Sequence, residues 1–128
     1  MKLFKNNAPL GELEAEVMET AWRLKKATVR DVLSQLKKKR LIAYTTIMTV
    51  MDRLYKKNIL SRSLNQSGAY IYYPARTKDQ FLALASKSAI KSLIKNFGEV
   101  AVAQFIDTVG HSSQRDLEQW RQKLKNIK

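Results

Sequence analysis

The chain contains no cysteine and only one histidine, His111. Without cysteine there can be no disulfide bond, zinc finger or thiolate metal site. His111 follows Gly110 in a predicted turn between helices, where a solvated loop residue is the expected role. No Cys-His or Ser-His-Asp grouping and no glycine-rich phosphate loop can be assembled from the remaining residues. We therefore expect no metal, no cofactor and no catalytic residue, and predict that the protein is not an enzyme.

Long hydrophobic runs are also missing. No apolar run approaches the roughly 20 residues that a membrane-spanning helix needs. The opening residues 1–5 (MKLFK) are far too short for a signal peptide. We therefore expect a cytoplasmic protein without membrane insertion.

Acidic residues are few. The 128 residues include 24 Lys and Arg but only 11 Asp and Glu, which gives a net charge of +13. Residues 20–75 alone hold 12 basic side chains against Asp31 and Asp52. Such a concentration of positive charge favours a polyanionic partner, either nucleic acid or an anionic membrane surface.

Apolar side chains recur at helical spacing in three segments of the N-terminal half, within residues 10–22, 28–36 and 43–58. The second segment begins at Thr28, a favourable N-cap residue, with Asp31 three positions later in the pattern of a capping box. It ends in the cationic stretch KKKR. The sequence thus predicts three short helices, the last two separated by a basic turn.

Residues 43–58 (AYTTIMTVMDRLYKKN) carry the strongest functional signal. One face has the apolar residues Ile47, Val50, Met51 and Leu54. The other face has threonines and cations: Thr45, Thr46, Thr49, Arg53, Lys56 and Lys57. An ordinary solvated helix gives no reason for three outward threonines, each of which weakens a helix by a few tenths of a kcal/mol. Short threonines at the N-terminal end can enter a major groove while longer cations reach phosphates, so we predict a DNA-recognition helix.

After residue 58 the apolar period changes from helical to alternating. Residues 59–64 (ILSRSL) and 69–74 (AYIYYP) are strand-like, and the turn-like NQSG separates them. This β-hairpin offers Arg62 and Tyr70 as candidate wing contacts to DNA. Three helices followed by a hairpin predict a winged helix-turn-helix, and we assign residues 1–75 to a DNA-binding domain.

Residues 76–128 predict a second unit of three helices, interrupted near Gly98 and Gly110. A unit of this size is too small to bury its own apolar surface. We expect that surface to pair with a second copy, since two-fold dimers are the commonest oligomers. The predicted dimerisation residues are Phe81, Leu82, Ile90, Leu93, Ile94, Phe105, Ile106, Val109, Leu117, Trp120 and Leu124. The fold class is thus mainly α with a small β-hairpin.

Three stretches, LGELEAEVMETAW, AYTTIMTVMDRLYKK and AYIYYP, resemble the BlaI/MecI family of bacterial penicillinase repressors over about residues 9–110. The resemblance implies a winged helix that binds an inverted-repeat operator and C-terminal helices that dimerise. In beta-lactam-responsive members, a membrane sensor metalloprotease leads to cleavage of an Asn-Phe bond, and Asn96-Phe97 lies at a similar place here. Phe97 could equally be a core residue beside the helix-ending Gly98. Met48 stands where some members carry Arg, which implies a different base preference.

We therefore expect a homodimeric, sequence-specific repressor that binds double-stranded operator DNA. Two other functions fit the same residues. An architectural protein would bind the DNA backbone without preferring an operator. A ligand-responsive winged-helix regulator would bind a small molecule between its C-terminal helices. The operator, the regulated genes and the inducing signal are not encoded in any pattern of the sequence.

Overall fold

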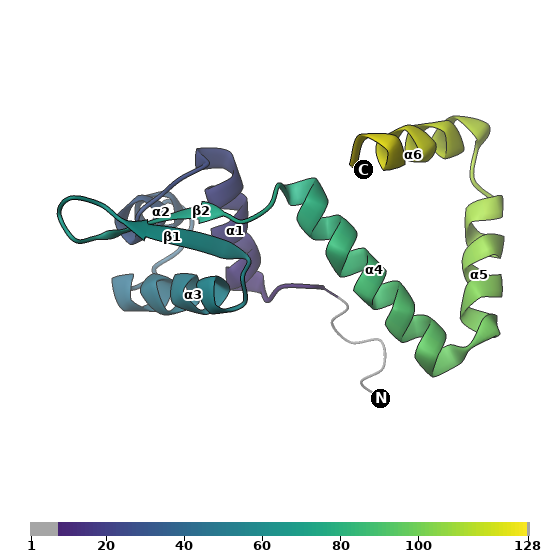
Figure 1. The fold of residues 1–128 in the computed structure, drawn as a ribbon, viewed down its shortest axis with the longest axis horizontal. Coiled ribbons are helices and arrows are strands. Elements are labelled where there is room, and N and C mark those ends of the chain that lie inside the picture. Colours follow the sequence, from purple (N-terminus) through teal and green to yellow (C-terminus); the bar gives the residue numbers. More distant parts are fainter. Residues whose placement is uncertain (1–7, 128) are drawn as a thin grey trace. The chain divides into compact units, whose positions relative to one another are not determined.

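A computed structural model of the protein describes residues 8–127 (Figure 1). It is mainly helical with one two-stranded antiparallel hairpin, as the sequence predicted. The chain divides into two compact units at Lys78 and Asp79. The elements are α1 Glu12–Leu24, α2 Val29–Leu36, α3 Tyr44–Lys56, β1 Leu60–Leu64, β2 Tyr70–Pro74, α4 Lys78–Phe97, α5 Glu99–Gly110 and α6 Gln114–Ile127.

The first unit is a winged helix-turn-helix with a core of its own. All of its buried apolar side chains lie between Val17 and Tyr72, on α1, α2, α3 and the hairpin. The predicted capping box at the start of α2 is confirmed: the Thr28 side chain accepts from the Asp31 backbone N–H, and Asp31 accepts from the Thr28 backbone N–H. These bonds satisfy N–H groups that the first helical turn would otherwise leave unpaired.

The predicted apolar stripe of α3 is confirmed, since Ile47, Val50, Met51 and Leu54 are all buried. The chain leaves α3 through Asn58, which has a positive φ of 63°. Asparagine tolerates this left-handed conformation better than most residues. Asn58 therefore turns the chain from the helix into β1.

The hairpin pairs β1 with β2 so that Arg62 lies opposite Tyr72. Its turn is held by the Asn65 side chain, which accepts hydrogen bonds from Ser67 and from the Ala69 backbone N–H. Tyr72 is buried and its strand is bridged to Ala27, at the entry to α2. One hairpin tyrosine thus packs on the helices, and the wing is fastened to the helical core.

The second unit consists of α4, α5 and α6, which form the helices predicted for residues 76–128 (Figure 1). Gly98, at φ 66°, separates α4 from α5. The three helices make few contacts with one another, and none of their described residues is buried. Within residues 8–127, no helix combines the length and apolar character needed to cross a bilayer.

Candidate nucleic-acid interface

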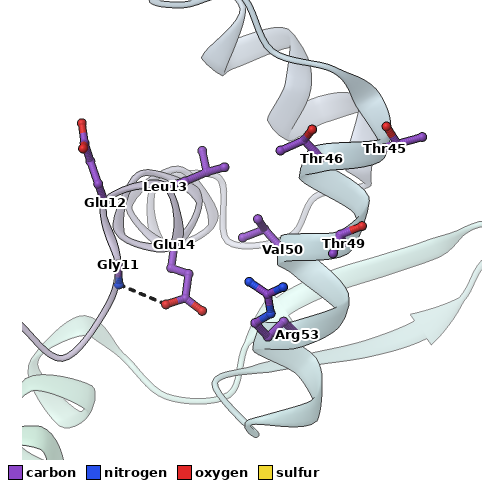
Figure 2. A pocket seen from close by; sticks show the side chains of 9 residues that line it. All are labelled: Gly11, Glu12, Leu13, Glu14, Thr45, Thr46, Thr49, Val50 and Arg53. Carbon is purple, nitrogen blue, oxygen red and sulfur yellow. Dashed lines mark hydrogen bonds between the residues drawn. The ribbon is translucent and has the colours of Figure 1, made fainter.

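The threonines of α3 lie on its exposed side, which is the orientation that the sequence predicted. Figure 2 shows Thr45 and Thr49 pointing away from α1, whereas Thr46 turns towards it, above Val50. The core holds the opposite face of α3, because Ile47 and Leu54 are fully buried. The helix therefore presents short polar side chains outward from a rigid support.

A hollow lies beside this face, between the start of α1 and α3 (Figure 2). Its lining residues are Gly11, Glu12, Leu13, Glu14, Thr45, Thr46, Thr49, Val50 and Arg53. The backbone N–H of Gly11 donates to the Glu14 carboxylate at 3.0 Å. This bond, with the ammonium of Lys57 and the charge of Arg53, lowers the pKa of Glu14 below its ordinary value despite its burial. Glu14 is therefore a fixed negative charge at the edge of the predicted DNA-binding face.

Two of the predicted phosphate contacts already have ionic partners inside the protein. The Lys57 ammonium lies 3.0 Å from Glu14, and the Lys56 ammonium lies 3.0 Å from Asp52. Arg53 is exposed and forms no ion pair among residues 8–127. Lys56 and Lys57 must exchange a carboxylate for a phosphate if they bind DNA, whereas Arg53 need not.

The predicted wing contact Arg62 is largely covered, with only 17% of its side chain exposed. Its guanidinium donates to Asp52 at 2.9 Å and to the Tyr72 hydroxyl at 3.2 Å. It also lies over the rings of Tyr55 and Tyr70, at 3.9 and 4.0 Å from their centroids. This placement argues against the direct DNA contact that we predicted for Arg62.

The electrostatics around Asp52 follow from these contacts. Hydrogen bonds from Lys56 and then from Arg62 lower the pKa of Asp52, which stays ionised. Desolvation opposes the charged form of Arg62, but its bonds to Tyr72 and Asp52 outweigh this effect and raise its pKa. The one acidic side chain of α3 is thus neutralised by two neighbouring cations.

The structure adds one surface residue that the sequence did not single out, Tyr44, and places it beside Met48. Tyr44 and Met48 lie on the side of α3 that faces the hairpin, with 42% and 43% of their surfaces exposed. They line a groove together with Arg30 and the hairpin turn. Met48 was noted only through the family resemblance, and no sequence signal distinguished Tyr44. The groove extends the exposed face of α3 towards the wing.

Further cations lie on the same unit. Arg30, Lys37, Lys38 and Lys39 are exposed and form no ion pair within the described part of the chain. Arg40, in contrast, binds the carboxylates of Glu12 and Glu16 at 3.3 and 2.9 Å. In the basic turn between α2 and α3, three exposed lysines are therefore available to bind a partner, whereas the arginine that follows them joins the turn to α1.

The residues predicted for dimerisation lie on the surface of the second unit. Phe81, Val109 and Leu117 are partly buried, and the other eight are exposed: Leu82, Ile90, Leu93, Ile94, Phe105, Ile106, Trp120 and Leu124. The exposed fraction reaches 62% for Phe105 and 64% for Ile106. Such a large set of uncovered apolar side chains is typical of an interaction surface. Val100, which is 66% exposed, extends this surface beyond the predicted set.

Asn96 and Phe97, the candidate cleavage position, form the last turn of α4 and are exposed. The Asn96 amide donates to the Ser92 hydroxyl at 3.4 Å. His111 caps the end of α5 and lies 3.3 Å from Asp107 with 80% of its side chain exposed. No group of three or more His, Cys, Asp or Glu residues within 8–127 could hold a metal ion.

Comparison with known families accounts for this combination of a winged helix and an exposed helical unit. The sequence model described as penicillinase repressor matches residues 10–126, nearly the whole chain. The chain belongs to the penicillinase repressor family. This is a family of transcriptional repressors and not of enzymes.

One relative is similar enough to give the same family assignment. The chain is 35% identical to the transcriptional regulator BlaI of Mycobacterium tuberculosis over 103 residues, which cover 79% of this chain and 74% of the relative. It is 28% identical over 98 residues to the methicillin resistance regulatory protein MecI of Mammaliicoccus sciuri, covering 70% of this chain and 79% of that one. Among solved structures, it is similar to the DNA-binding domain of the repressor BlaI, with 25% identity and a TM-score of 0.49 over 59% of this chain and 90% of that chain.

Proposed function

We propose that this penicillinase repressor family member is a homodimer that represses transcription by binding an inverted-repeat DNA operator. The observation that carries this proposal is the outward row of Thr45 and Thr49 on α3, beside Arg53, which forms no ion pair among residues 8–127. Threonine hydroxyls bond base edges or phosphates, and their methyl groups can contact thymine. Family membership supplies the second, independent support.

The contacts divide by function along α3. Thr45, Thr46 and Thr49 read base edges, since their short side chains let the helix approach the floor of the major groove. Arg53, Lys56 and Lys57 bind phosphates near the other end of the helix, as do the lysines of the basic turn at 37–39. Phosphate contacts position the helix and make affinity depend on salt, but carry no sequence information.

Thr49→Ala tests whether α3 reads bases. We expect it to reduce the preference for the operator over random duplex by about tenfold, a typical cost of one lost base contact. Affinity for random duplex should stay unchanged, because the substitution removes no charge. The measurement is fluorescence anisotropy at physiological salt, with an operator that the wild-type protein has selected from random DNA.

Thr108→Ala is the matched control, since it removes an exposed helical threonine of the other unit whose hydroxyl bonds only the Gln104 carbonyl of its own helix. It should leave the operator preference intact. If the wild-type protein binds operator and random duplex with equal affinity, the result would instead support an architectural function.

Dimerisation through the second unit is supported by its uncovered apolar side chains. A helical unit in which none of the described residues is buried gains little stability from its own packing. A second copy offers the same apolar surface and so can bury it in a self-complementary interface. Two linked winged helices then occupy two half-sites, and the second binding event becomes intramolecular. The domain division proposed from sequence, DNA binding before residue 76 and dimerisation after it, follows this scheme.

A small-molecule effector is less well supported. The cavity between α4 and α5 is lined by Ile90, Leu93, Ile94, Ala101, Val102 and Phe105, and its volume is about 120 Å³. Pockets for drug-sized ligands are usually about 300–1,000 Å³ and contain a few polar groups that orient the ligand. This apolar cavity is better suited to a side chain of a partner subunit.

Derepression by proteolysis, with a sensor metalloprotease as partner, is the further part of the proposal. Its support is the position of Asn96 and Phe97, exposed at the end of a helix and followed by Gly98, where local unfolding costs little. We expect mass spectrometry of the protein from beta-lactam-treated cells to find a fragment ending at Asn96. An intact chain in cells that have begun to express the repressed genes would contradict cleavage.

A further inference from the structure

Arg62 connects three elements of the winged helix. Arg62 itself lies on β1. On α3 it contacts its ionic partner Asp52 and the ring of Tyr55. On β2 it contacts the ring of Tyr70 and the hydroxyl of Tyr72. Tyr70 and Tyr72 pack edge to face, with their centroids 6.1 Å apart. The guanidinium is therefore the centre of a polar and aromatic cluster between the predicted recognition helix and the wing.

This cluster differs from the apolar core in what it can specify. Apolar packing is non-directional, whereas a planar guanidinium forms hydrogen bonds only at fixed angles and stacks on ring faces. Arg62 satisfies both conditions at once, with two hydrogen bonds and two rings within 4.0 Å. A hairpin attached in this way has a defined orientation relative to α3.

The cluster also determines the charge of the exposed α3 face. Asp52 lies on the same side of the helix as Thr49, three positions before it, and Lys56, four positions after it, where a free carboxylate would repel DNA phosphates. Lys56 binds one of its oxygens at 3.0 Å and Arg62 binds the other at 2.9 Å. Removing Arg62 would leave this carboxylate half-neutralised on the DNA-facing surface.

We propose that Arg62 is a positioning residue for operator binding, which orients the wing on α3 and neutralises Asp52 without contacting DNA. This inference rests on the proposed function, and it replaces the wing contact predicted from sequence. Its physical basis is preorganisation. A wing that samples several orientations binds with an affinity reduced in proportion to its competent fraction.

The test compares Arg62→Gln, Arg62→Lys and Tyr55→Leu with the wild-type full-length protein. Affinities for a selected operator and for random duplex are measured over a salt series, at a temperature where circular dichroism shows every variant to be folded. We expect Arg62→Gln to bind the operator about tenfold more weakly, as expected if only a tenth of the molecules hold the competent orientation. The slope of log affinity against log salt should change by clearly less than the roughly 0.9 of a lost phosphate contact, because only the partial repulsion from Asp52 is added.

The other two variants separate geometry from charge. Arg62→Lys keeps the positive charge but loses the planar group that reaches Asp52, Tyr72 and both rings, so it should remain impaired. Tyr55→Leu leaves Arg62 in place and removes one stacking ring, so it should weaken operator binding with an unchanged salt slope. Tyr55 is 37% exposed, and its replacement should leave the fold intact.

Three results would overturn the inference. If Arg62 contacts a phosphate directly, the slope of log affinity against log salt should be about 0.9 shallower for Arg62→Gln than for the wild-type protein. Arg62→Gln should then bind both duplexes more weakly, and Arg62→Lys should keep most of the wild-type affinity. A purely structural role would appear as unchanged operator affinity in the folded variants. If the wild-type protein shows no operator preference, the proposed function fails, and the inference fails with it.

Discussion

Removing residues 79–128 should weaken binding to a full inverted-repeat operator by at least about a hundredfold, while binding to a single half-site stays the same. The reason is the loss of the second, intramolecular binding event, since α3 and the wing remain complete. The fragment 1–78 contains the whole buried core. It also keeps two contacts beyond residue 75, the hydrogen bond from the Trp22 indole to the Arg76 carbonyl and the ion pair of Lys78 with Glu19. Fluorescence anisotropy on both duplexes, with sedimentation to measure mass, checks this result.

A point variant tests the same mechanism in the full-length chain. Phe105→Glu places a charge in the exposed apolar surface of α5 and should produce monomers with the weak full-operator binding of the fragment. Gln104→Glu adds the same charge at the neighbouring exposed position, about 100° around the same helix, and is the matched control. If monomeric Phe105→Glu binds the full operator as tightly as the wild-type protein does, dimerisation is not the source of the high affinity.

Leu54→Ala should lower the free energy of unfolding of the winged helix by about 2–5 kcal/mol, the usual cost of truncating a buried leucine. Leu54 has 0% of its surface exposed and anchors α3 against the core. The stability of a small domain is only about 5–15 kcal/mol, so this loss could unfold a large fraction of the molecules. Urea unfolding of the fragment 1–78, followed by the fluorescence of its single tryptophan, Trp22, measures the change.

Leu41→Ala is the matched control, because Leu41 is fully exposed in the turn between α2 and α3, at 104% of its reference surface. The same chemical change there should alter stability by less than about 0.5 kcal/mol. Equal effects of the two substitutions would mean that the packing of α3 is not what stabilises this unit.

Local patterns in the sequence were sufficient to predict the elements of the fold. The apolar period of residues 43–58 predicted the buried face of α3, because a helix places every third or fourth side chain on one side. Thr28 with Asp31 predicted the start of α2, since a capping box depends on neighbouring backbone groups alone. The outward direction of Thr45 and Thr49 followed from the same helical geometry.

Which basic side chains form ion pairs or stack on aromatic rings depended on tertiary structure. Sequence reasoning treated Arg53, Lys57 and Arg62 alike, as free positive charges near DNA. Lys57 pairs with Glu14 of α1, and Arg62 of β1 pairs with Asp52 of α3 and stacks on Tyr70 of β2. These contacts therefore require the mutual placement of α1, α3 and the hairpin. No local spacing contains that information.

The sequence by itself therefore determined which segments are helices or strands and which face of each is polar, because both follow from the periodicity of neighbouring residues. Only the tertiary structure decided which polar side chains are available to a partner. It gave Arg53 no ion pair among residues 8–127, tied Lys57 to Glu14, and placed Arg62 over the rings of Tyr55 and Tyr70. The physical reason is that ion pairs and ring stacking act over a few ångströms in space, between residues that the chain brings together only when it folds.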